Sequence, residues 1–96
     1  MDCFVYVLGC HSGSRQLTYV GWSNDVMARL AKHNVGKGAK TTRGHSWQLL
    51  HSEWFPTKRE AMSREWHLKR DRKFRKQLAA KINVAPKKKR KKKRVA

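Results

Sequence analysis

Three side chains that suit phosphate chemistry lie close together in the first third of the chain: Tyr19, Arg29 and His33. A strand over Leu17–Val20 is predicted to lead directly into a helix that ends near residue 34. Arg29 and His33 are four residues apart, so they share one face of that helix near the end of the tyrosine's strand. A phenol, a fixed cation and an imidazole that converge there are suited to a phosphate ester. The alternative is a solvated arginine, a surface histidine and a half-buried strand tyrosine.

The start of this helix is predicted from its capping residues. Ser23 or Asn24 is expected to be the N-cap, with Asp25 in the first turn, where a negative charge suits the helix dipole. An apolar stripe at helical spacing follows, made of Val26, Met27, Leu30 and Ala31.

A second helix carries an isolated carboxylate. Thr57 is expected to cap this helix, and Glu60, three residues on, matches a capping box. Five side chains share one broad sector of the helix: Ala61, Met62, Glu65, Trp66 and Leu68. Glu65 is the charged member, so it requires a basic residue, protonation or a metal ion as a partner. A salt bridge to one of the many Arg or Lys residues is the simplest of these.

The other apolar segments predict the remaining elements. Cys3–Leu8 is β-branched and aromatic, which is typical of a strand buried on both faces, and a polar hairpin connection follows it. A third strand is expected over Trp47–Phe55, where Pro56 ends it. Apolar side chains at four-residue spacing predict a last helix over residues 70–82. The predicted order is therefore β-β-α-β-α-α.

Glycines and cations fill residues 35–44, which predicts a loop. Its glycines would let backbone N–H groups approach an anion, and Lys37, Lys40 and Arg43 would bind phosphates. A merely mobile, solvated loop is the alternative. The spacing differs from GxxxxGK[ST], so the loop does not indicate an NTPase.

Positive charge dominates the composition, with 24 Lys and Arg against 6 Asp and Glu and a net charge of +18. Eight consecutive cations occupy Lys87–Arg94, yet residues 1–86 still carry 16 basic against 6 acidic side chains. Such a field attracts polyanions, of which nucleic acid is the commonest. An anionic membrane surface would compete, but no segment approaches the ~18 apolar residues of a membrane span. The acidic N-terminus is also unlike a signal peptide.

Cys3 and Cys10 lack the spacing of a zinc site. On an extended strand they are roughly 23 Å apart, too far for a disulfide. We therefore expect reduced thiols and an intracellular protein.

The order of these motifs resembles that of the GIY-YIG nucleases over about residues 3–80. Two tyrosine-containing strands, Phe4-Val5-Tyr6 and Tyr19-Val20-Gly21, precede the helix with Arg29 and His33-Asn34. The loop, third strand and glutamate-bearing helix follow in order. The chain is most similar to small stand-alone members related to the catalytic domain of the eukaryotic structure-specific endonuclease subunit. The resemblance implies a small α/β domain with a three-stranded, mainly antiparallel sheet flanked by helices.

The resemblance also implies an Mg²⁺- or Mn²⁺-dependent endonuclease that hydrolyses phosphodiester bonds of branched or duplex DNA in repair or recombination. Tyr6 and Tyr19 match the motif tyrosines, Arg29 the helix arginine, Glu65 the metal-binding glutamate, and His33 a histidine common in this branch. One carboxylate would leave the ion mostly water-coordinated, as Mg²⁺ prefers. Either tyrosine or the histidine would serve as general base. A phenol titrates near ~10, so its cationic surroundings would have to lower its pKa, whereas imidazole titrates near neutrality unaided.

Two positions depart from the family pattern. Phe4 stands where the first motif has a glycine, which a strand tolerates. Trp22 follows Gly21 where excision-repair members carry a lysine, so Lys37 and Lys40 are the candidates to replace that cation.

The chain is expected to divide into a nuclease domain, residues 1–82, and a disordered basic tail, residues 83–96. The tail would bind DNA through Lys87, Lys88, Lys89, Arg90 and their neighbours, because counterion release favours any such run. It also resembles a nuclear-import signal. Location is therefore expected in the cytoplasm or nucleoid, or in the nucleus if the tail directs import.

A non-catalytic nucleic-acid-binding protein on the same scaffold is the competing hypothesis. Binding alone does not require Glu65, so its presence beside the other matching positions favours the enzyme.

Overall fold

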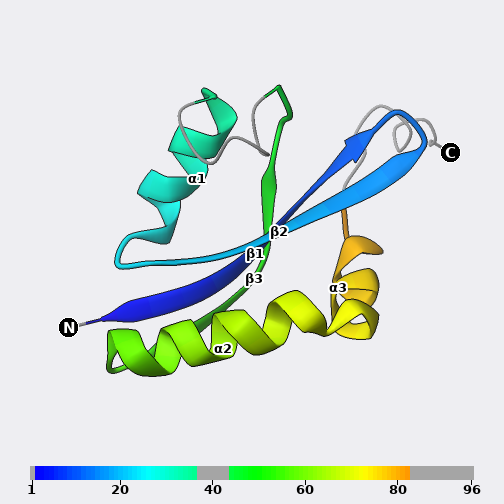
Figure 1. The fold of residues 1–96 in the computed structure, drawn as a ribbon. Coiled ribbons are helices and arrows are strands. Elements are labelled where there is room, and N and C mark those ends of the chain that lie inside the picture. The colour runs from blue at the N-terminus through cyan, green and yellow to red at the C-terminus, as the bar shows by residue number, and fades with distance from the viewer. Residues whose placement is uncertain (1, 37–43, 83–96) are drawn as a thin grey trace, which may run out of the picture.

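The structure, a computed structural model, describes residues 2–36 and 44–82. Three strands and three helices follow the predicted order (Figure 1): β1 (Cys3–Ser12), β2 (Arg15–Ser23), α1 (Val26–Asn34), β3 (Gln48–Phe55), α2 (Lys58–Arg70) and α3 (Arg72–Ala79). The predicted α/β class and order are confirmed. The predicted phosphate-binding residues Lys37, Lys40 and Arg43 and the tail with Lys87, Lys88, Lys89 and Arg90 lie outside the described residues.

The strands form one antiparallel sheet in the order β2-β1-β3, so β1 is central. Ser12 pairs with Arg15 across the hairpin, which leaves Gly13 and Ser14 in the turn. Gly13 has a φ of 64°, and a glycine at the first turn position is what this kind of two-residue hairpin requires. The expected mainly antiparallel sheet is thereby confirmed.

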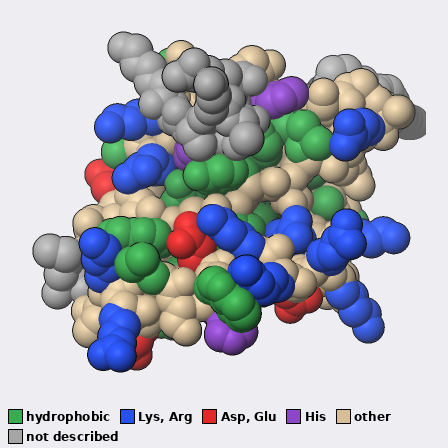
Figure 2. Space-filling model, in the orientation of Figure 1, with side chains coloured by type: hydrophobic (Ala, Val, Ile, Leu, Met, Phe, Trp, Pro, Cys, Tyr) green, Lys and Arg blue, Asp and Glu red, His purple; other side chains and the backbone are tan. Residues whose placement is uncertain are grey.

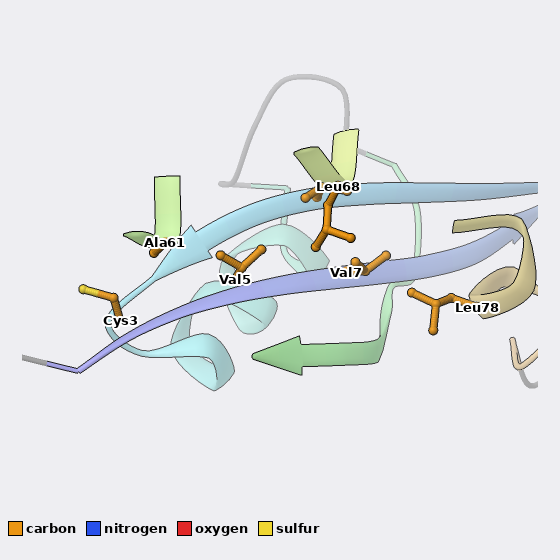
Figure 3. Close-up of a cluster of buried hydrophobic side chains, with 7 residues drawn as sticks. Cys3, Val5, Val7, Ala61, Leu68 and Leu78 are labelled. Atoms are coloured by element: carbon orange, nitrogen blue, oxygen red, sulfur yellow. The ribbon is translucent and has the colours of Figure 1, made fainter. Parts of the chain in front are cut away.

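Both faces of β1 are covered, by α1 on one side and by α2 and α3 on the other (Figure 1). Figure 3 shows alternate side chains of β1 on the face that α2 and α3 cover. The core on this face contains Cys3, Val5, Val7, Ala61, Leu68 and Leu78. The opposite face of β1 contributes Tyr6, Leu8 and Cys10. This confirms a strand buried on both faces. Cys3 and Cys10 are free and lie on opposite faces of β1.

The N-cap of α1 is Asp25, so the predicted cap at Ser23 or Asn24 was wrong. An Asp25 carboxylate oxygen accepts a hydrogen bond from Ala28 N at 3.1 Å. Ser23 is unavailable because it still pairs with Phe4 in the sheet, and its hydroxyl oxygen accepts instead from Asp25 N at 3.0 Å. Asn24 donates to the carbonyl of Asp2.

Thr57 caps α2 as predicted, accepting from Glu60 N at 3.2 Å and donating its hydroxyl proton to the Glu60 carboxylate. The last helix is shorter than predicted, because Asp71 ends α2 and begins α3. Its carboxylate accepts from Phe74 N at 3.0 Å. Pro56 ends β3 where expected, but that strand begins one residue after Trp47.

The predicted apolar sector of α2 is narrower in the structure. Ala61 and Leu68 are fully buried, whereas Met62 and Trp66 are 46% and 54% exposed. The helix therefore contacts the sheet along a thin stripe and leaves a mixed apolar and charged side in solvent. No helix in the described ranges is long and apolar enough to cross a membrane.

Candidate active site

The centre of the candidate site is a hydrogen bond between β1 and α1. The Tyr6 hydroxyl lies 3.1 Å from Nε2 of His33, and both side chains are about 1% exposed. His33 occupies the last turn of α1, so the packing of this helix on the sheet holds its imidazole over the central strand. The structure thus joins two predicted catalytic residues from different elements.

Gly21 provides the room for the Tyr6 phenol. The two residues pair across β1 and β2, and the phenol lies against the glycine backbone. A methyl group at Gly21 would come 2.6 Å from the Tyr6 hydroxyl oxygen and 2.8 Å from its Cζ. Both separations are too short for real contacts, so only glycine fits here without moving the phenol.

Tyr19 lies beside this pair on the same face of the sheet. Its ring centroid is 4.8 Å from that of His33 and 6.4 Å from that of Tyr6. The three rings therefore form one cluster, which contains Tyr19 and His33 of the strand-to-helix corner together with Tyr6 of the central strand.

Trp47 closes the cluster and was not predicted to belong to it. Its ring is buried, and its centroid is 6.4 Å from that of Tyr19. The Asn34 side chain fixes it by donating to Trp47 O at 3.1 Å and accepting from Trp47 N. An amide directly after His33 was the one sequence signal for this contact, and nothing in the sequence indicated its partner.

Arg29 and Glu65 complete the group of predicted catalytic residues. Each acts electrostatically on both phenols, and Arg29 also acts on His33, which places the two charges in the neighbourhood of the aromatic cluster. The Glu65 side chain is 20% exposed and its carboxylate lies 3.6 Å from Lys69 Nζ, one helical turn along α2. Arg29 lines an open hollow of about 220 Å³ with its neighbours Trp22, Ser23, Asn24, Asp25, Ala28 and Lys32.

Burial sets the protonation states of the aromatic cluster. It raises the pKa of the Tyr6 phenol, with Tyr19 and Glu65 adding to the effect and Arg29 opposing it. It raises the pKa of Tyr19 likewise. A phenol base would need cationic surroundings that lower its pKa, but here the cost of desolvating a phenolate outweighs the attraction of Arg29. Burial and Arg29 lower the pKa of His33, so its imidazole is neutral at pH 7.

Glu65 is the predicted metal ligand, and its surroundings fit a hard divalent cation held by few protein groups. In residues 2–36 and 44–82 no three His, Cys, Asp or Glu side chains lie together as a metal cluster. A lone, half-buried carboxylate suits Mg²⁺, which retains several waters and binds through one or two carboxylates and substrate phosphates.

Comparison with known proteins identifies the domain. The family model described as the GIY-YIG catalytic domain matches residues 2–79. The chain belongs to the GIY-YIG family. Tyr6 and Tyr19, which the sequence resemblance matched to the two motif tyrosines, are the two phenols of the buried cluster.

GIY-YIG relatives with similar sequences include UPF0213 proteins from bacteria and archaea. The one from Staphylococcus epidermidis is 45% identical over 67 residues, which cover 69% of this chain and 78% of the relative. The one from Halobacterium salinarum is 47% identical over 66 residues, 68% of this chain and 82% of the relative. A solution NMR structure of the UPF0213 protein BH0048 from Bacillus halodurans is 39% identical, covers 90% of each chain and has a TM-score of 0.47.

Proposed function

We propose that this domain is a divalent-metal-dependent endonuclease that hydrolyses DNA phosphodiester bonds. The observation that carries the proposal is the buried Tyr6–His33 hydrogen bond, with the charges of Arg29 and Glu65 near enough to act on the phenols. Membership of a family of endonucleases supports the same reaction class. The large positive charge supports DNA as the partner.

His33 and Tyr6 would move the proton of the attacking water together. A neutral imidazole with an unprotonated Nε2 accepts the Tyr6 hydroxyl proton, while the phenol oxygen accepts a proton from water. No phenolate has to form, so the raised pKa of Tyr6 is no obstacle. We therefore assign His33 as the proton acceptor and Tyr6 as the group that contacts the water.

Arg29 and Glu65 would act on the phosphate. A fixed guanidinium beside the phenols offsets charge that accumulates on the phosphate oxygens. Glu65 would hold Mg²⁺ or Mn²⁺, and the bound ion would supply Lewis-acid polarisation of the phosphate. Lys37, Lys40 and Arg43 stay proposed phosphate contacts, and branched or duplex DNA in repair or recombination stays the proposed context.

One contact favours a second candidate, a non-catalytic nucleic-acid-binding protein. The Glu65 carboxylate has a cation, Lys69, within 3.6 Å on its own helix, so it has a structural role without any metal. The pair is loose and Lys69 is 55% exposed, and exposed pairs of this spacing contribute only about 0.3–0.5 kcal/mol. A metal ion that approached the carboxylate would therefore displace the ammonium at little cost.

A cleavage assay separates the two candidates. Labelled flap, nicked, junction and plain duplex DNA are incubated with the full chain, with Mg²⁺ or with EDTA. We expect metal-dependent cleavage, its loss in Glu65→Ala, and retained or tighter DNA binding by that variant because a negative charge is removed. Glu60→Ala removes a carboxylate from the same helix away from the cluster and should keep cleaving. Absence of cleavage of every substrate by the native chain would favour the binding protein.

A further inference from the structure

A second hollow lies between β2 and α3, apart from the aromatic cluster. Its volume is about 380 Å³, and its lining contains three cations and no carboxylate: Gln16, Thr18, Arg72, Arg75, Lys76 and Ala79. Gln16 and Thr18 lie on the face of β2 that packs against α2 and α3, because alternate strand residues share a face. We refer to this hollow as the β2–α3 groove.

Arg75 is held in place in the groove by neutral partners only. Its guanidinium donates to Leu68 O at 3.1 Å, to Lys69 O at 2.8 Å and to the Thr18 hydroxyl oxygen at 3.2 Å. No carboxylate of the described residues lies within ion-pair distance of it. The side chain is partly buried and donates to carbonyls of the last turn of α2, so its positive charge is fixed in position without an ion-pair partner among the described residues. An ordered, unpaired guanidinium of this kind is suited to an anion.

Two exposed cations flank this fixed one. Arg72 and Lys76 are four residues apart on α3, so both face the groove, and both are exposed. The opposite wall is held by Gln16, whose side-chain amide donates to Ala79 O at 3.1 Å. The groove thus presents three positive charges on a surface fixed to the sheet. Phosphate is the anion that this arrangement suits best, because arginine binds it with several donors at once.

The groove is adjacent to the candidate active site. Lys69, whose carbonyl binds Arg75, extends its ammonium group to the carboxylate of Glu65. Thr18 directly precedes Tyr19 in β2, but its side chain points to the opposite face of the sheet, and three steps along the strand, about 10 Å, lead from Thr18 to Gly21. Figure 2 shows Lys and Arg side chains gathered over α2 and α3 on one face of the molecule. β2 is an edge strand, so a phosphate backbone that crosses this edge from the aromatic cluster past Glu65 and Lys69 would reach the groove.

We propose that the β2–α3 groove is a second phosphate-binding site, which holds the backbone of the bound nucleic-acid strand beyond the phosphate that is cleaved. The proposal rests on the proposed function for the identity of the ligand and deepens it by assigning a path to the strand. Arg75 is the fixed contact, and Arg72 and Lys76 close on the phosphates from the α3 side.

The test measures DNA binding in EDTA, so cleavage plays no part. The full chain with Arg72→Gln and Lys76→Gln is compared with a matched double variant, Lys73→Gln and Lys81→Gln, which removes two exposed charges in and just after α3 outside the groove. Affinity for a labelled duplex is measured over a series of salt concentrations. We expect the groove variant to bind more weakly and to lower the slope of log Kd against log salt by about 2, one for each phosphate contact. The matched variant should keep the native slope.

Charge reversal provides a second measurement, in which Lys76→Glu should weaken binding much more than Lys73→Glu. Equal losses in the groove and matched variants would overturn the proposal, because they would show a general effect of charge. Loss of binding to phosphatidylglycerol vesicles with unchanged DNA binding would also overturn it and identify a lipid site. If the native chain cleaves DNA but the groove and matched variants lose equal DNA affinity, the proposed function stands and the groove proposal fails. If the native chain cleaves no DNA but the variants show the expected salt-dependence slopes, the groove proposal stands and the proposed function fails.

Discussion

The Tyr6 hydroxyl and Nε2 of His33 lie 3.1 Å apart in a nearly solvent-free part of the sheet's α1 face. In this position burial is the main determinant of the protonation of both groups. The imidazole is neutral because burial disfavours its cation, and the phenol keeps its proton because burial disfavours its anion. A proton can pass between them without either group carrying a charge beforehand.

Tyr6→Phe tests whether the phenol is required for the chemistry. The ring and its packing remain, but the hydroxyl that joins water to His33 is lost. We expect DNA cleavage to fall about a hundredfold or more while DNA affinity stays within about twofold. Single-turnover cleavage and equilibrium binding measure the two quantities. Tyr19→Phe is the comparison, and a larger loss there than in Tyr6→Phe would contradict the assignment.

The pH dependence of cleavage follows from the two pKa directions. A lowered His33 pKa keeps the imidazole able to accept a proton at pH values below its ordinary ~6.5, so cleavage should decline only below that value. A raised Tyr6 pKa means that phenolate does not form near neutrality, so the rate should be flat from about pH 7 to 9. Single-turnover rates at saturating DNA check this. A tenfold rise per pH unit across that range would indicate a phenolate or hydroxide base instead.

The lowered pKa of His33 also affects folding stability, so the decline of cleavage at low pH requires a control. The unfolded chain takes up a proton at a higher pH than the folded chain, so this contribution to stability falls as pH drops below about 6.5. Circular dichroism at each pH must show a folded chain before lost cleavage is attributed to chemistry.

Gly21→Ala should displace the Tyr6 phenol. The added methyl group would meet the hydroxyl oxygen and Cζ at 2.6 and 2.8 Å. We expect a loss of about 1–3 kcal/mol in unfolding free energy, as overpacking typically causes. Removing the hydroxyl with Tyr6→Phe relieves part of this clash, so the double variant should lose less than the sum of the single losses. Urea denaturation of the native chain, the two single variants and the double variant measures the coupling. Strict additivity of the losses in unfolding free energy would show that the two residues do not interact.

Glu53 should control acid stability. Its carboxylate accepts from Arg64 Nε at 2.8 Å and lies 2.6 Å from His51 Nε2, and the arginine hydrogen bond, followed by that of the histidine, lowers the pKa of Glu53. The folded pKa is below the unfolded one, so this stabilisation is present above about pH 4.3 and is lost as pH falls through the folded value.

Glu53→Gln should therefore lower the unfolding free energy by about 1–2 kcal/mol at pH 7 and flatten its decline in acid. Urea denaturation at a series of pH values measures both effects. Glu60→Gln, whose carboxylate contacts the Thr57 hydroxyl rather than a cation, is the matched control and should keep the native pH dependence. An unchanged acid decline in Glu53→Gln would show that another group is responsible.

Local sequence signals predicted the elements well, because they depend on neighbours in the chain. The two-sided burial of Cys3–Leu8, the Thr57 cap and the end of β3 at Pro56 all follow from short-range chemistry. Predictions failed where a residue had two roles. Ser23 was bound in the sheet and could not cap α1, and Asp71 both ended one helix and began the next inside a continuous apolar spacing.

The sequence indicated candidate residues for the site but not the electrostatics of their surroundings. Motif order indicated Tyr6 and His33, but only their packing shows that desolvation exceeds the effect of Arg29 on the phenols. The sequence indicated only a strand residue at Trp47. Its contact with Asn34 joins segments thirteen residues apart, so it leaves no periodic signal in the sequence. Long-range geometry of this kind cannot be obtained from spacing along one chain.

The two hydrogen bonds between the Asn34 amide and the Trp47 backbone have a consequence for the position of His33. They tie together the two ends of the intervening stretch directly beside the tyrosine rings. The position of His33 is therefore held from two directions, by the packing of α1 on the sheet and by the attachment of the next residue to the segment that leads into β3.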